Sequence, residues 1–93
     1  MRFSSSYGTI TLTKERKSHI FAFHPDVIPC LPHFAETLAN PDSAIISVHD
    51  ATVVIYYRFL ARRKRYLAIV VKLSNHPFVL TAYLAKKPKR SIL

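Results

Sequence analysis

The chain has 93 residues, of which 49% are hydrophobic and 20% charged, and this balance fits one small globular domain. Fourteen Lys and Arg against five Asp and Glu give a formal net charge of +9. The single cysteine, Cys30, excludes an internal disulfide and favours a reducing compartment, while the longest apolar stretch, residues 66–71, is too short for a membrane-spanning helix. With no signal-peptide pattern at the start, we expect a cytoplasmic protein without a membrane partner.

The charge is unevenly distributed along the chain. All five acids lie in the first 50 residues, and residues 51–93 contain ten Lys and Arg but no Asp or Glu. Folding does not require such an asymmetry, and a strongly positive region attracts polyanions, of which nucleic acid is the most abundant in the cytoplasm. Nucleic acid is therefore the expected partner. A basic surface that only aids solubility is the alternative.

The first half of the chain predicts a short strand and two helices. Residues 7–12 alternate and are rich in Thr and Ile, which favours a strand. Thr13 is a suitable N-cap for a helix that Pro25 ends near His24. A second helix is expected across residues 31–38, where apolar residues follow the 3.6-residue period, and Asn40 with Pro41 ends it.

The second half changes to the alternation typical of strands. Four strands are predicted at residues 44–48, 52–60, 65–73 and 78–84, and short turns connect them. The predicted fold class is α+β, with two N-terminal helices packed on a four-stranded antiparallel meander and a short strand at the N-terminus. We expect residues 1–93 to form a single domain with a core at 7–85. Residues 86–93 would be a basic tail, mobile unless a ligand orders it.

Strand alternation suggests a polar site on the face opposite the helices. If the apolar residues of the last strand face the core, Thr81 and Tyr83 lie on the open face, where Tyr56 and Arg58 of a neighbouring strand could join them. Arg binds phosphate through two nitrogens, and hydroxyls donate to its oxygens. An ordinary solvated sheet face is an equally simple interpretation.

Two histidines are further candidates. His19 and His24 lie on or at the end of the first predicted helix, and histidine transfers protons near neutral pH. Either could instead stabilise the helix C-terminus. The His, Cys and acidic residues show no standard metal-ligand spacing, and P-loop and Rossmann signatures are absent, so no metal or other cofactor is expected.

Five segments in order resemble a known group of nucleases. They are LTKERKSHIFAFHPD, ETLANPDSAI, VIYYR, RYLAIVVKL and FVLTAYLAKKPK. They are similar to the small phage- and plasmid-associated nucleases of the barnase–EndoU–colicin–RelE group, across nearly the whole chain. The resemblance implies metal-independent RNA cleavage by attack of a 2′-hydroxyl. It assigns the catalytic positions to His19, His24, Arg58, Thr81 and Tyr83.

These observations predict a small endoribonuclease, plausibly the toxin of a toxin–antitoxin pair with an acidic antitoxin-like partner. The alternatives are a non-catalytic nucleic-acid-binding module and a module that binds an acidic protein. The residues expected to contact nucleic acid are aromatic or basic: Tyr56, Arg62, Arg63, Lys64, Arg65, Lys72, Lys86, Lys87, Lys89 and Arg90.

Overall fold

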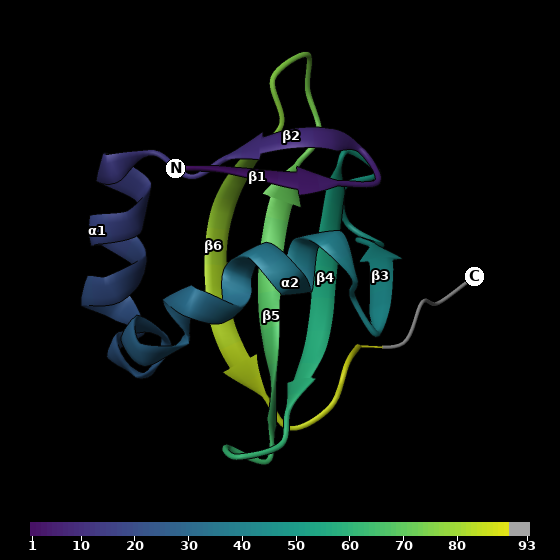
Figure 1. The fold of residues 1–93 in the computed structure, drawn as a ribbon. Coiled ribbons are helices and arrows are strands. Elements are labelled where there is room, and N and C mark those ends of the chain that lie inside the picture. Colours follow the sequence, from purple (N-terminus) through teal and green to yellow (C-terminus); the bar gives the residue numbers. More distant parts are fainter. Residues whose placement is uncertain (90–93) are drawn as a thin grey trace.

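A computed structural model describes residues 1–89 of the chain. The elements follow in the order β1 (Arg2–Ser5), β2 (Gly8–Thr11), α1 (Lys14–Phe23), a 3₁₀ segment (Pro25–His33), α2 (Phe34–Ala39), β3 (Ser43–Ile46), β4 (Val53–Leu60), β5 (Arg65–Lys72) and β6 (Phe78–Ala85). The strands form one six-stranded sheet in the order β1-β2-β6-β5-β4-β3. The sheet curls into a half-barrel, with α2 across its inner side and α1 beside β6 (Figure 1).

The predicted fold class is wrong. The four expected strands are present as β3 to β6 and the expected N-terminal strand as β2, but β1 was not predicted, and the mixed six-stranded sheet outweighs the two short α-helices. β1 and β2 form an antiparallel hairpin, and β2 joins β6 in parallel, where Thr11 pairs with Phe78. The sheet is mixed because β2 runs parallel to β6, whereas every other neighbouring pair is antiparallel.

The N-terminal hairpin is closed by local hydrogen bonds. Gly8 adopts a φ of +91°, a conformation that L side chains rarely adopt. The Ser5 hydroxyl accepts from the Tyr7 N–H and donates to the Gly8 carbonyl. The Thr11 N–H then donates to the Pro77 carbonyl at 3.0 Å, which fixes the hairpin beside β6.

Prolines shorten the helical part of the molecule. The Thr13 hydroxyl accepts from the Arg16 N–H at 3.1 Å, so α1 begins at the predicted cap. After α1, prolines at positions 25, 29 and 32 remove backbone donors, and the chain continues as 3₁₀ turns. The predicted second helix therefore begins only at Phe34 and contains six residues.

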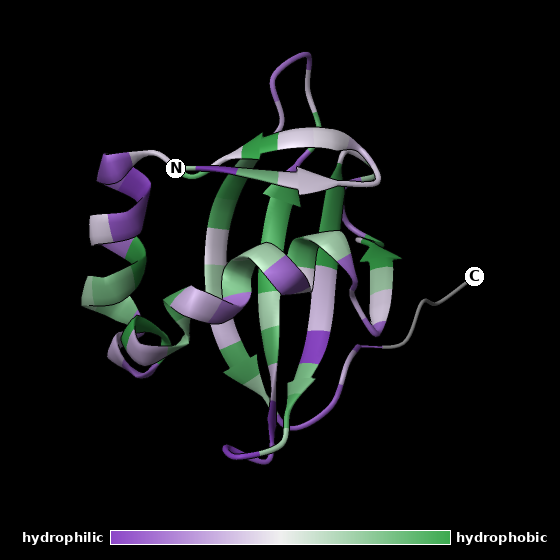
Figure 2. Ribbon diagram, viewed as in Figure 1, coloured by the Kyte–Doolittle hydropathy of each residue, from purple (hydrophilic) through white to green (hydrophobic). Residues whose placement is uncertain are grey.

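The sheet has an apolar cluster on each face. The main core lies on the inner face and is formed by buried residues such as Ile10, Phe34, Tyr56 and Ile69. A smaller cluster on the second face is centred on Ile55, Tyr57 and Ala68. Hydrophobic residues run along β4, β5 and β6, whereas the turn between β4 and β5 is hydrophilic (Figure 2).

Within residues 1–89 no helix is both long and apolar enough to cross a bilayer.

A β-bulge changes which residues of β6 face the core. Val70 pairs with Thr81 and Val71 pairs with Val79, so Leu80 is the extra residue. Val79 consequently joins Ala82 in the main core, although strict alternation from Thr81 would place it on the second face.

Candidate functional site

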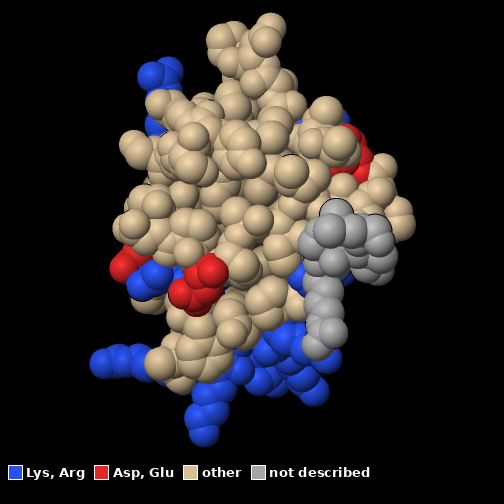
Figure 3. Space-filling model, turned by 90° about the vertical axis from the view of Figure 1, so that its right-hand side faces the viewer, with Lys and Arg blue, Asp and Glu red and all other residues tan. Residues whose placement is uncertain are grey.

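One end of the sheet is strongly basic. The turn between β4 and β5 carries Arg62, Arg63 and Lys64, and Arg65 begins β5. Ala85 pairs with Tyr66, which brings the residues after β6 to the same end. We call this set the basic end: Arg62, Arg63, Lys64, Arg65, Lys86 and Lys87. Lys and Arg side chains crowd the lower part of the molecule in Figure 3, and within residues 1–89 no ion pair involves these six.

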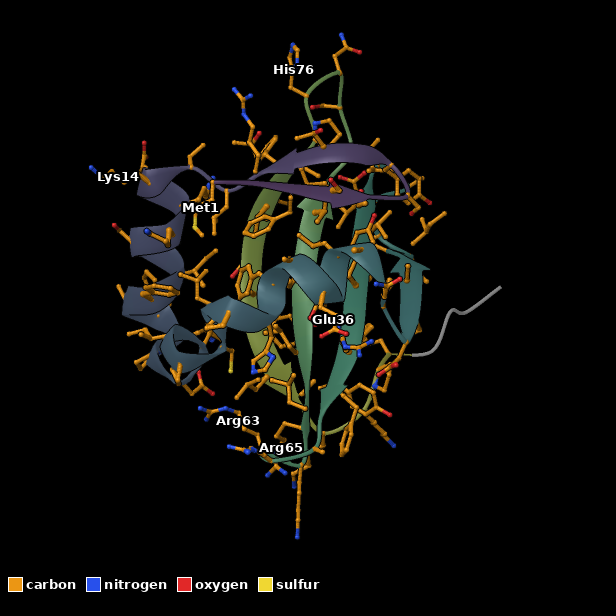
Figure 4. All side chains as sticks on the ribbon, in the orientation of Figure 1. Met1, Lys14, Glu36, Arg63, Arg65 and His76 are labelled. Atoms are coloured by element: carbon orange, nitrogen blue, oxygen red, sulfur yellow. The ribbon has the colours of Figure 1, made fainter. Side chains whose placement is uncertain are left out.

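A hollow of about 680 Å³ opens beside the basic end on the inner side of the sheet. Its polar lining comes from three elements: the helical segment supplies His33 and Glu36, β4 supplies Arg58, and the turn supplies Arg62 and Arg63. Pro29, Phe59, Leu60 and Ala61 complete its wall. In Figure 4, Glu36 extends from α2 over β4, and Arg63 and Arg65 lie below it.

A hydrogen-bonded pair forms one wall of this hollow. Arg58 Nη2 donates to Glu36 Oε1 at 2.9 Å, and Arg58 Nη1 donates to the Asn40 carbonyl at 2.7 Å. The Arg58 side chain is 30% exposed and that of Glu36 is 55% exposed, so both remain accessible from solvent. The two contacts hold the guanidinium in a fixed plane and leave other N–H donors for a ligand.

His33 is placed in the hollow by the anchoring of α2. Phe34, Thr37 and Leu38 are buried, which fixes the opposite side of the helix towards the solvent. The Thr37 hydroxyl donates to the His33 carbonyl at 2.7 Å. His33 precedes Glu36 by three residues, a spacing that brings side chains about 5–6 Å apart between their Cβ atoms on a helical surface. An imidazole, a carboxylate and a guanidinium therefore share one hollow.

The expected grouping of Tyr56, Arg58, Thr81 and Tyr83 on one open face is wrong. Arg58 contacts α2 on the inner side, and Tyr56 is fully buried in the main core. Tyr83 packs on the second face beside Tyr57. The prediction assigned Tyr56 and Arg58 to the face opposite the helices, but the apolar residues Val54, Tyr56 and Leu60 bring the alternate positions of β4, and with them Arg58, to the helix side.

The two histidines of the sequence motif lie outside the hollow. The His19 ring packs on Phe23 of the same helix, with ring centroids 4.7 Å apart. His24 caps α1 through its backbone N–H, which donates to the Ile20 carbonyl, and its ring centroid is 6.3 Å from that of Tyr83. Burial and the neighbouring Tyr57 hydroxyl raise the pKa of Tyr83 above its ordinary value, so Tyr83 remains protonated.

The predicted nucleic-acid contacts are spread over several surfaces. Lys72 lies at the other end of β5, where it pairs with Asp50 at 3.0 Å. The Lys89 N–H donates to the Tyr57 hydroxyl on the second face. Tyr56 is buried and cannot stack on a base, and Arg90 lies outside the described residues. The six residues of the basic end remain together.

Sequence reasoning missed His33 and Glu36. They are three residues apart in a segment where Leu31, Phe34 and Leu38 mark the apolar stripe, so their position opposite that stripe was a readable signal. The contact with Arg58 was not readable, because it joins residues 22 positions apart.

Comparison with known proteins identifies no relative. No protein-family model matches the chain, and neither a curated protein nor a solved structure is similar to it. In residues 1–89 no group of three or more His, Cys, Asp or Glu is arranged to hold a metal ion. The resemblance to the nuclease group therefore stays a prediction, and the geometry of the hollow has to support any functional assignment.

Proposed function

We propose that the protein is a small metal-independent endoribonuclease that cleaves RNA at the hollow beside the basic end. The observation that supports it is the meeting of His33, Glu36 and Arg58 in one accessible hollow, next to Arg62 and Arg63. This combination contains a proton acceptor, a proton donor and a fixed positive charge, which are the groups that cleavage by an internal hydroxyl requires.

The reaction follows from the chemistry of these groups. The Glu36 carboxylate takes the proton of a ribose 2′-hydroxyl, and the 2′-oxygen forms a bond to the adjacent phosphorus. The bond between phosphorus and the 5′-oxygen breaks, and protonated His33 gives its proton to that leaving oxygen. Arg58 stabilises the negative charge that grows on the phosphate oxygens. The products are a 2′,3′-cyclic phosphate and a free 5′-hydroxyl.

The rest of the basic end would bind the flanking phosphates. Contacts from Lys and Arg to phosphate position a nucleic acid without reading its sequence. An acidic protein that covers this end would block access to the hollow, which is how a toxin of this kind would be silenced by its partner.

The test is cleavage of a defined RNA by the purified protein in excess EDTA, with mapping of the product ends. We expect 2′,3′-cyclic ends, and we expect Glu36→Gln to lose activity by about 10²-fold or more because the carboxylate can no longer accept the proton. Glu15→Gln, the same change at an exposed carboxylate of α1 that does not line the hollow, serves as the matched control. RNA binding without cleavage would assign a non-catalytic binding function, and activity only with divalent ions would contradict this mechanism.

A further inference from the structure

An exposed aromatic pair lies at the basic end on the second face of the sheet. Phe59 of β4 and Tyr66 of β5 are cross-strand partners, and their ring centroids are 5.1 Å apart. Phe59, the second-last residue of β4, is 45% exposed, although its partner strand β5 continues beside it. Part of its ring surface is thus free to contact a ligand.

The absence of a neighbouring strand explains this exposure. β3 begins at Ser43, which pairs with Tyr57, so β4 extends beyond β3 towards the basic end. The Phe59 N–H instead donates to Asp42 Oδ2 at 2.6 Å. Asp42 thereby satisfies the Phe59 N–H, and the Phe59 side chain stays exposed.

Positive charge surrounds the aromatic pair on the side of the turn. Arg65 directly precedes Tyr66, and Lys86 follows Ala85, the strand partner of Tyr66. The chain after β6 then passes the ends of β5 and β4 and reaches the Tyr57 hydroxyl at Lys89 (Figure 1). Phosphates would lie along these cations, while the carboxylate of Asp42 disfavours a phosphate on the opposite side of the ring.

Phe59 also connects this surface to the hollow, because it forms part of the wall that Arg58 and Leu60 continue. The Phe59 ring itself lies on the second face of the sheet, so a single strand whose phosphate enters the hollow would pass round the free end of β4 to place a neighbouring base on the ring. Proteins that bind unpaired nucleic acid combine such rings with a basic track for the backbone.

We infer that the exposed ring of Phe59, against which Tyr66 packs edge-on at an interplanar angle of 61°, forms a base-stacking platform that selects single-stranded RNA. The inference rests on the proposed function for its choice of RNA, but it concerns binding and does not require cleavage. A duplex cannot use the platform, since its bases are already stacked and paired.

The test measures binding of a 2′-O-methyl oligonucleotide, which lacks the attacking hydroxyl and cannot be cleaved. A 2-aminopurine base within the single strand reports stacking through quenching of its fluorescence. We expect Phe59→Leu, which keeps an apolar side chain, to bind about tenfold more weakly and to lose the quenching. Tyr7→Leu is the matched control, because Tyr7 is 46% exposed and contacts Tyr56 away from the basic end.

The outcomes separate this inference from the proposed function. Equal affinity of Phe59→Leu and Tyr7→Leu for the single strand, or equally tight binding of the 2′-O-methyl duplex by the unchanged protein, would overturn the platform. Stacking on Phe59 in a protein that fails to cleave ordinary RNA would support the platform and reject the nuclease. Thermal unfolding of each variant confirms that the comparison is made between folded proteins.

Discussion

Two histidines of the helical part of the chain, His33 and His24, differ in whether charged groups lie beside them. His33 shares the hollow with a carboxylate that Arg58 holds at 2.9 Å. His24 lies beside Tyr83, whose raised pKa keeps its hydroxyl protonated in an apolar setting. A reaction near neutral pH requires groups that accept and release protons there. The histidine of the sequence motif, His24, therefore has an aromatic neighbour. His33, which the sequence did not single out, shares its hollow with a carboxylate and a guanidinium.

The largest expected effect is the difference between the two histidine variants. His33→Ala should reduce cleavage by about 10²-fold or more, because the leaving oxygen loses its proton donor. His24→Ala should keep cleavage within a few fold. Single-turnover rates on one RNA, measured with both variants and the unchanged protein, test this.

The reverse ranking would move the active site to the second face. Cleavage that depends on His24 and survives the loss of His33 would support the catalytic role that the sequence resemblance assigns to His24 and Tyr83, and it would reject the hollow.

A smaller effect should follow from removing the cations on either side of the basic end. Arg62 and Arg63 line the hollow, whereas Lys86 and Lys87 follow β6. Each phosphate contact to a single strand contributes about 0.7 to the slope of log affinity against log salt, so changing either pair to Gln should reduce the slope by about 1.4. Titrations of a non-cleavable oligonucleotide at several salt concentrations measure it.

The cleavage rates of the same two double variants distinguish the cations that line the hollow from those that follow β6. Arg62→Gln with Arg63→Gln should also slow cleavage at saturating RNA, because these residues border the reacting phosphate. Lys86→Gln with Lys87→Gln should weaken binding alone. An unchanged slope in both double variants would show that the basic end does not contact phosphate.

The smallest effect is expected at the far end of the sheet, where Lys72 pairs with Asp50 and supports the fold. The Thr52 hydroxyl, the Thr52 N–H and the Lys72 ammonium all donate to Asp50, and these bonds lower its pKa from 3.8 to about 2. Because the folded state favours the carboxylate, this contribution to stability is present above pH 3.8 and is lost as the pH falls towards 2.

Asp50→Asn should therefore unfold at a lower temperature than the unchanged protein at pH 6, and the difference should narrow between pH 4 and pH 2. Its RNA cleavage at pH 7 should be normal, since Asp50 and Lys72 lie away from the hollow. Melting curves across this pH range test the expectation. A difference in melting temperature that stays constant down to pH 2 would contradict the role of the Asp50 carboxylate.

Local features of the fold were predictable from sequence, and the features that depend on distant contacts were not. The Thr13 cap and the four strands of the meander follow from side-chain chemistry and alternation, which act over a few residues. β1 escaped prediction because Arg2–Ser5 is short and polar, and it is a strand only through its pairing with β2.

The candidate site shows the same limit. The sequence was enough to place the turn cations Arg62, Arg63 and Lys64 on the surface, because a turn between two strands is exposed whichever face of the sheet is the core side. The face that Arg58 occupies could not, since Tyr56 and Tyr57 are both fully buried and either could have marked the core side. Alternation along β4 alone does not tell which of its two faces is the core side, and the packing of α2 on the sheet decides this.

The parallel bridge between β2 and β6 has a consequence for the order in which the protein forms. β2 is synthesised well before its sheet partner Phe78, which follows the three antiparallel strands β3 to β5. A ribosome-bound chain can assemble the β4–β5 hairpin early, but the half-barrel stays open until β6 emerges. Since pairing across such a separation is slow, closure of the N-terminal hairpin onto β6 should be a late step of folding. Because α2 packs against β1, where the Phe3 and Phe34 rings lie 6.1 Å apart, the α2 wall of the hollow should be completed only in this late step.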